Sequence, residues 1–160
     1  MNKLSYKVAH KIYSKITDGT HDSPKQQNSG KPLITSKHIK SRNINFDSAY
    51  LISEIDYKKI NERSQVEKWD VIVSMIGEYC GFSYVERNDN IEYAVKNVGL
   101  FKTGSKLEAE WLYYYLNSPI GKQHLNSSKS GSSQPYLTLG ALRNLPILLA
   151  KDYNSKFKIV

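Results

Sequence analysis

The sequence predicts an α+β domain in which short strands come first, helices follow, and long polar loops lie between them. Two observations support this fold class. Short runs rich in β-branched residues, bounded by turn-forming residues, occupy the first two thirds of the chain. In the last third, apolar residues recur instead with the spacing of one helix face. We therefore expect a short mixed β-sheet followed by packed helices.

The strands are expected between polar segments. Residues 7–16 fit either a helix or a strand. Residues 17–31 are rich in Gly, Asp, Asn, Ser and Pro, which predicts a long loop or a pair of turns. The run that ends at Gly77 has the pattern of a buried strand. The predicted strands are 32–35, 70–76, 82–87 and 94–101.

A first helix is predicted from Ser53, as its N-cap, to about Arg63. Asp56 occupies the capping-box position, and we expect Ile55 and Ile60 to face the core.

The last third of the chain carries the other helices. One helix face is predicted from Leu107, Trp111, Leu112, Tyr115 and Leu116. Ser118 caps a further helix that has Pro119 at its first position. Residues 129–135 then form a Ser/Gly loop, and residues 137–145 form one more short helix before Pro146.

Composition indicates one soluble domain. A chain of 160 residues that is 39% hydrophobic can bury a core. Its longest nearly unbroken apolar run, 145–150, is far shorter than the roughly 20 residues that cross a bilayer. The single cysteine, Cys80, excludes an internal disulfide, and His10, His38 and His124 lack the spacing of zinc ligands. We expect a cytoplasmic protein without metal or membrane segment.

The charge distribution favours a polyanionic partner. The net charge is +8, and it is +6 over residues 1–50, −4 over 51–95 and +6 over 96–160. Lysine and arginine displace condensed counterions when they contact phosphates, so a basic face on a domain of this size suits nucleic acid. The alternative is a basic surface without a specific partner.

A basic turn follows the strand predicted at 32–35. Lys37, His38, Lys40 and Arg42 lie within six residues, with Asn43 beside them. Lysine and arginine anchor phosphates or bind guanine, and asparagine suits adenine, so we expect this turn to contact DNA. The alternative is a solvated basic turn. Two lysines of the preceding polar segment complete this part of the predicted DNA-binding set: Lys25 and Lys31.

A second candidate contact is the Ser/Gly loop. Ser130 and Ser132 let the backbone approach a phosphate closely, Lys129 adds charge, and Gln134 can pair with a base edge. The alternative is a flexible connector.

The Asp18-Gly19-Thr20-His21 segment has a structural and a catalytic interpretation. We favour the structural one, in which Asp18 and Thr20 cap local backbone and Gly19 supplies an unusual φ angle. A DNA contact by His21 is the next alternative. A small hydrolase that uses Asp18 and His21, with Cys80 as a candidate third member, is the last alternative, because no nucleophile is evident beside Asp18 and His21 in the sequence.

Four stretches in fixed order carry a resemblance to a known family. They are Ile-Thr-Asp-Gly-Thr-His-Asp-Ser-Pro at 16–24, Pro-Leu-Ile-Thr-Ser-Lys-His-Ile at 32–39, Lys-Trp-Asp-Val-Ile-Val-Ser-Met-Ile-Gly-Glu at 68–78, and Ser-Gly-Ser-Ser-Gln-Pro-Tyr-Leu at 130–137, followed by Leu-Pro-Ile at 145–147. Together they resemble the target-recognition domain of specificity (S, or HsdS) subunits of Type I restriction-modification systems.

The sequence departs from that family at two places. Trp69 stands where the family usually has glycine, so we expect a different turn there. After Leu-Pro-Ile the family runs into a long spacer helix, whose opening pattern residues 148–160 lack. We therefore expect a recognition domain over residues 1–147, and a tail over 148–160 that is at most the start of a spacer helix.

The resemblance implies a DNA-specificity module without a catalytic centre. Such a domain would direct a partner methyltransferase (M) subunit, and through it a restriction (R) subunit, to one half of a split target in double-stranded DNA. The sequence has no glycine-rich phosphate loop and no Asn-Pro-Pro-aromatic or Asp-Pro-Pro-aromatic motif, so we expect no cofactor and a methyl donor on the partner. The competing functions are the hydrolase and a non-specific nucleic-acid or protein-interaction domain.

Overall fold

The computed structural model describes residues 4–149 and has the expected α+β fold. Its strands form three small sheets, where we expected one. The strands are β1 (Ser5–Val8), β2 (Lys15–Asp18), β3 (Lys31–Thr35), β4 (Leu51–Ile52), β5 (Asp70–Ser74), β6 (Ser83–Val85), β7 (Ala94–Lys96), β8 (Val98–Lys102) and β9 (Pro146–Leu149). The helices are the 3-10 helices η1 (Ala9–Lys11) and η2 (Ser36–His38), and α1 (Glu54–Ser64), α2 (Lys106–Asn117), α3 (Pro119–Ser128) and α4 (Leu139–Arg143).

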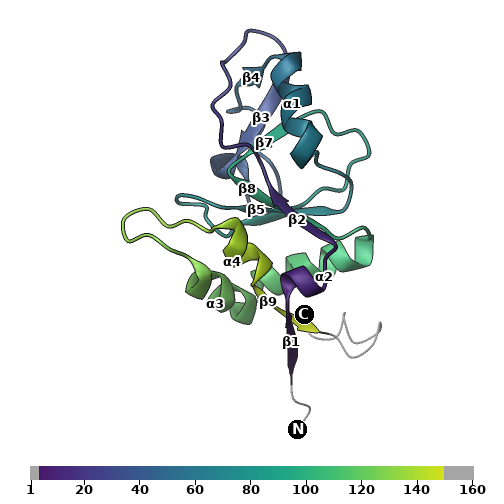
Figure 1. Ribbon diagram of the computed structural model, residues 1–160, viewed down its shortest axis with the longest axis vertical. Coiled ribbons are helices and arrows are strands. Elements are labelled where there is room, and N and C mark those ends of the chain that lie inside the picture. Colours follow the sequence, from purple (N-terminus) through teal and green to yellow (C-terminus); the bar gives the residue numbers. More distant parts are fainter. Residues whose placement is uncertain (1–3, 150–160) are drawn as a thin grey trace.

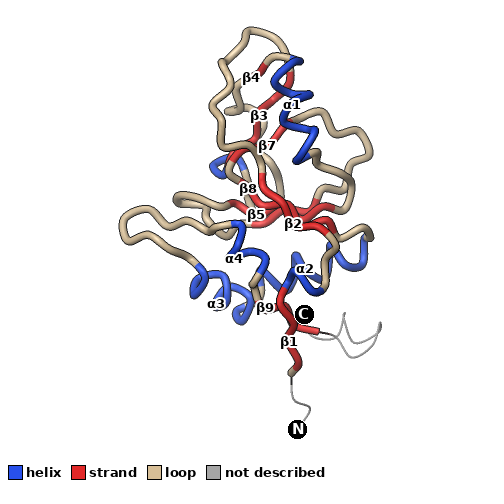
Figure 2. The backbone as a smooth tube through the Cα atoms, in the orientation of Figure 1, coloured by secondary structure: helices blue, strands red, loops and turns tan. Residues whose placement is uncertain are grey.

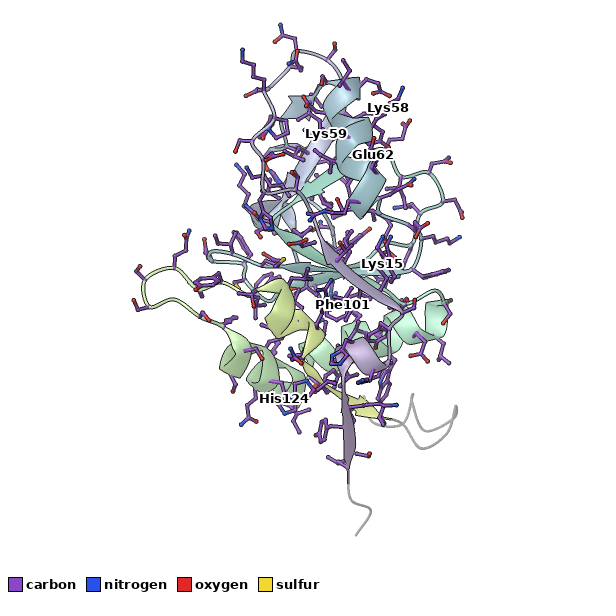
Figure 3. All side chains as sticks on the ribbon, viewed as in Figure 1. Lys15, Lys58, Lys59, Glu62, Phe101 and His124 are labelled. Carbon is purple, nitrogen blue, oxygen red and sulfur yellow. The ribbon has the colours of Figure 1, made fainter. Side chains whose placement is uncertain are left out.

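The central sheet has the order β2-β8-β5-β6 and is antiparallel throughout. Successive side chains of a strand point to opposite faces, and both faces of this sheet are covered. Val71, Val73 and Phe101 pack on the face that α2 and α4 cover, and Figure 3 shows Phe101 in that layer. Ile72 and Leu100 pack on the other face, against residues of β3 and β7. All five residues of β5 are therefore buried.

A second sheet, β4-β3-β7, lies beyond the central sheet and carries α1 on its outer side (Figure 1). The third sheet is the antiparallel β1-β9 pair, which lies at the opposite end of the molecule with α2 and α3. Long loops connect the strands of the upper part, and they are drawn in tan in Figure 2.

The strand predicted at 94–101 is two strands that belong to different sheets. β7 pairs in parallel with β3, whereas β8 pairs antiparallel with β2 and β5. Asn97 separates them with a φ of 55°. Asparagine tolerates this left-handed conformation better than most residues, and one such residue is enough to redirect the chain from one sheet to the other.

The helix caps are confirmed, and one helix face is corrected. The Ser53 side chain accepts a hydrogen bond from the Asp56 backbone N–H, and the Ser118 side chain accepts one from the Gly121 N–H. Ile60 is buried as expected, but Ile55 is 79% exposed. The two isoleucines are five residues apart, which places them about 140° apart around the helix, so they cannot share a face.

Trp69 corrects a second expectation. Its φ is 70°, so it adopts the left-handed conformation that glycine favours, and the turn before β5 is of the kind that a glycine would make. Strand β9 continues to Leu149, and Leu148 is part of the main core, beyond the boundary expected at 147. Residues 150–160 of the expected tail lie outside the described residues.

Candidate nucleic-acid interface

Three segments that are distant in the sequence meet on one side of the molecule. We call them the basic turn (residues 36–43), the central turn (75–82, between β5 and β6) and the serine loop (129–136). The central turn and the serine loop project from the same side in Figure 1. An isolated antiparallel bridge between Ile76 and Tyr136 joins them.

Ser36 connects the basic turn to the central turn. It is buried, and its hydroxyl oxygen accepts hydrogen bonds from the backbone N–H groups of Met75 (3.1 Å) and Ile76 (3.2 Å). The same hydroxyl donates to the backbone carbonyl of Asn97, at 2.5 Å. The Ser74 hydroxyl in turn donates to the Ser36 carbonyl, at 3.2 Å. The start of the basic turn is therefore fastened to the end of β5 and to the residue at which the chain changes sheets.

The serine loop is fastened to the other side of the central turn. Leu137 N–H donates to Met75 O at 2.7 Å, and Gly77 N–H donates to Pro135 O at 2.9 Å. Within the loop, Ser130 and Tyr136 exchange two backbone hydrogen bonds of 2.9 and 3.0 Å. The loop predicted as a flexible connector or a contact is thus a small hairpin with defined backbone pairing.

The positive charges of these segments lie close to the central turn. The Lys40 ammonium lies 3.3 Å from the centre of the Tyr79 ring and donates to the Lys37 carbonyl at 2.8 Å. Lys40 N–H donates a hydrogen bond to Asn43 O at 2.9 Å and so closes a short turn. Arg42 and Asn43 are exposed at the tip of this turn.

The basic turn and the serine loop also share a cavity. A cavity of about 270 Å³ is lined by Ser41 of the basic turn and by Lys129 at the start of the serine loop. The Lys129 side chain lies over Gly81 of the central turn, which lines the same cavity. The two candidate contacts predicted from the sequence therefore belong to one surface.

Two further cavities, each of about 430 Å³, adjoin each other on this surface. Both are lined by Ile76 and Asn97. One extends toward the basic turn and the serine loop, where Lys37 and Gln134 line it. The other extends toward His21. We call the two cavities together the groove.

The Asp18-Gly19-Thr20-His21 segment borders the groove and is held by hydrogen bonds to its neighbours. Asp18 is buried, and its carboxylate lies 2.8 Å from Nε2 of His21. Nδ1 of His21 lies 3.0 Å from the side-chain oxygen of Asn97. The Thr20 hydroxyl accepts from Asp22 N–H at 3.1 Å, as an ST turn does. These bonds hold the end of β2 against the junction of β7 and β8.

The expected role of Gly19 is wrong in one respect. The φ angle of Gly19 is not positive, so the backbone conformation does not require a glycine there. A Cβ atom there would instead lie 2.4 Å from the Val95 carbonyl oxygen. Glycine is needed because two backbones approach closely.

The Asp18–His21 pair has the geometry of an acid–base pair. His21 also lines a second cavity with Ser64, whose buried hydroxyl donates to the Ile60 carbonyl. Among the described residues, no cysteine or serine lines the cavity that Asp18 and His21 share, and the Thr138 hydroxyl there caps α4 by accepting from Ala141 N–H. Cys80 lines a different cavity, and burial raises the pKa of its thiol. Between residues 4 and 149, no cluster of three or more His, Cys, Asp or Glu side chains could hold a metal ion. No helix in that range is long and apolar enough to span a membrane.

Three of the predicted DNA-binding residues lie away from this surface: His38, Lys31 and Lys25. His38 is fully buried, and its Nδ1 accepts a hydrogen bond from Thr35 N–H at 2.8 Å, which caps η2. Burial lowers the pKa of His38, and the charges of Lys37 and Lys40 lower it further. A buried, neutral ring cannot contact DNA, so that expectation is wrong. Lys31 lies at the far end of β3, paired with Glu92 at 2.8 Å.

Lys25 lies in the loop after β2 and lines neither cavity of the groove. Other residues of the surface were not predicted. Tyr79, Lys96 and Asn97 line the groove, and the Lys96 ammonium donates to the Ser23 hydroxyl at 2.6 Å. The available signal was the polar pair Lys96-Asn97 inside an otherwise apolar strand pattern, which is typical of a break in the strand.

No protein-family model matches the chain, and no curated protein sequence matches it. Solved structures do match. One is the S subunit of a Type I restriction-modification system from M. genitalium, with a TM-score of 0.63 and 12% identity, over 98% of this chain and 37% of that one. Another comes from a structural study of complex assembly and conformational transition of the Type I restriction-modification system, with a TM-score of 0.63 and 16% identity, over 99% of this chain and 37% of that one. The chain thus spans little more than a third of these proteins. It shares its fold with a part of the Type I restriction-modification S subunit, as the four motifs predicted.

Proposed function

We propose that this chain is a non-catalytic, sequence-specific DNA-binding module of a Type I restriction-modification system. One observation carries the proposal. The basic turn and the serine loop, which the sequence singles out independently as DNA contacts, lie on opposite sides of the central turn and form one surface. A duplex needs such an arrangement, because phosphate contacts set the register while side chains between them reach base edges.

The residues divide into two roles. Lys37, Lys40, Arg42 and Lys129 anchor phosphates around the groove. Gln134, whose amide nitrogen lies 3.9 Å from the position of a Cβ atom on Gly77, reads a base edge from within it. The fold likeness to S subunits supports the further proposal that the module directs an M subunit, and through it an R subunit, to a DNA half-site.

The test begins with selection of binding sites from random double-stranded DNA by the purified 160-residue chain. A reader enriches one sequence and prefers it to random DNA by a factor of about 1,000 or more, whereas a charge-only binder enriches none. Strong binding without enrichment would support the non-specific alternative and overturn the proposal.

The triple variant Lys37→Ala, Lys40→Ala and Arg42→Ala then tests the surface. Each lost phosphate contact should flatten the slope of log K against log salt by about 0.9. A matched control removes three exposed lysines outside the groove, namely Lys11, Lys58 and Lys106, of which Figure 3 shows Lys58 on α1. Equal slopes for the two triple variants would remove the basic turn from the interface.

A further inference from the structure

Two large apolar side chains lie exposed at the centre of the groove. Ile76 is 36% exposed and lines both cavities, and Tyr136 is 42% exposed and lines one of them. The two residues are partners in the antiparallel bridge between the central turn and the serine loop. Exposed apolar side chains that gather on one site, rather than lying scattered, are typical of a contact surface.

The fold does not account for these side chains. The bridge is held by the backbone: Gly77 N–H donates a hydrogen bond to Pro135 O, and Leu137 N–H donates one to Met75 O. The Ser36 hydroxyl adds a bond to the Ile76 N–H. None of these bonds depends on which side chain the two bridge residues carry. Their backbone is nevertheless held in place, which fixes the points from which the two exposed side chains project.

The charges around the pair indicate what it contacts. Lys37 and Lys96 line the groove together with the exposed Glu78, and Lys129 lines the neighbouring cavity at Gly81. Three lysines against one carboxylate leave a net positive charge around the apolar centre, and this combination complements a DNA duplex, whose phosphates flank the base edges.

Met75 and Leu137, which flank the bridge, are buried in the core, whereas Ile76 and Tyr136 are exposed, so the bridge presents its two apolar side chains at the surface. The major groove, about 12 Å wide, is wide enough to admit such side chains to the base edges.

We propose that Ile76 and Tyr136 determine specificity by contacting thymine methyl groups in the major groove of the bound duplex. This inference rests on the proposed function and deepens it. The thymine C5-methyl is the apolar feature that the major groove presents, and it distinguishes thymine from the other bases. The polar side chain of Gln134 beside the pair would read a neighbouring base edge.

The experiment uses the site selected by the full chain and replaces each thymine in turn with deoxyuridine, which lacks only the methyl group. At least one replacement should weaken binding of the unaltered protein about fourfold, the effect of returning one methyl group to water. Ile76→Ala or Tyr136→Ala should weaken binding to the thymine site by a similar factor. When the variant lacks the side chain that contacts the methyl group, the same deoxyuridine replacement should cause no further loss of binding.

Matched controls are available on the helices. Ile55 is 79% exposed on α1 and Tyr114 is 43% exposed on α2, so Ile55→Ala and Tyr114→Ala should retain the full response to deoxyuridine. If every deoxyuridine site binds as tightly as the thymine site, the methyl contact is refuted while the proposed function stands. If Ile76→Ala weakens binding but deoxyuridine does not, the side chain acts by another contact and the inference is equally refuted. If selection enriches no sequence, the proposed function itself fails. The deoxyuridine series on the unaltered protein needs no variant to fold.

Discussion

Replacing Ser36 with alanine tests how the basic turn is attached to the rest of the surface. The hydroxyl bonds the N–H groups of Met75 and Ile76 and the carbonyl of Asn97. Met75 N–H also lies 3.2 Å from Asn97 O, so these two groups keep each other as partners after the substitution. Ile76 N–H loses its acceptor. A fully buried N–H without an acceptor costs about 1–3 kcal/mol. Because Ile76 is only partly buried, we expect the free energy of unfolding to fall by about 1 kcal/mol, at the low end of that range.

Ser64 provides the matched control because it is as buried as Ser36. Its hydroxyl bonds only the carbonyl of Ile60 in its own helix, at 3.0 Å. That carbonyl already accepts a helical hydrogen bond, so Ser64→Ala should cost about 0.5 kcal/mol or less. Urea unfolding followed by circular dichroism measures both values. If Ser36→Ala costs no more than Ser64→Ala, the hydroxyl does not fasten the basic turn and the reasoning is wrong.

Two further predictions concern the start of β5. Because Trp69 has a φ of 70°, the free energy of unfolding of Trp69→Gly should exceed that of Trp69→Ala by about 1 kcal/mol, although both variants lose the indole ring. Urea unfolding measures this difference. The usual order, with the alanine variant more stable, would contradict the left-handed conformation. Burial raises the pKa of Asp70 to about 6, against the opposing hydrogen bond from Lys102. The folded state therefore binds this proton more tightly than the unfolded state, in which the pKa is about 3.9. The resulting stability is fully present below about pH 4 and is lost as the pH rises through about 6. The stability of the unaltered protein relative to Asp70→Asn should thus fall by roughly 2–3 kcal/mol between pH 4 and pH 7 in urea unfolding, and a constant difference would refute the shift.

Local signals in the sequence determined the fold class, the helices and the candidate loops. Ser53 and Ser118 begin helices because a cap involves groups two or three residues apart. The β-branched run at β5 predicted a buried strand for a similarly local reason. The basic turn and the serine loop were also recognisable, since the residues that suit DNA are clustered within each of them. The strand predicted over 94–101 failed at Asn97, where the periodicity of side chains does not reveal a change of sheet.

Only the tertiary structure decided which of these residues share a surface. In the sequence, His38 stands among residues that suit a DNA contact. In the structure its Nδ1 accepts a hydrogen bond from Thr35 N–H, and its ring is buried in the interior. Lys31 lies at the start of β3, and the basic turn follows the other end of that strand. The basic turn and the serine loop are about 90 residues apart in the sequence, and they meet because each one bonds to the central turn at the end of β5. Which sheet edges pair, and therefore which loops become neighbours, depends on burying apolar faces of the whole domain, and no local stretch of sequence contains that information.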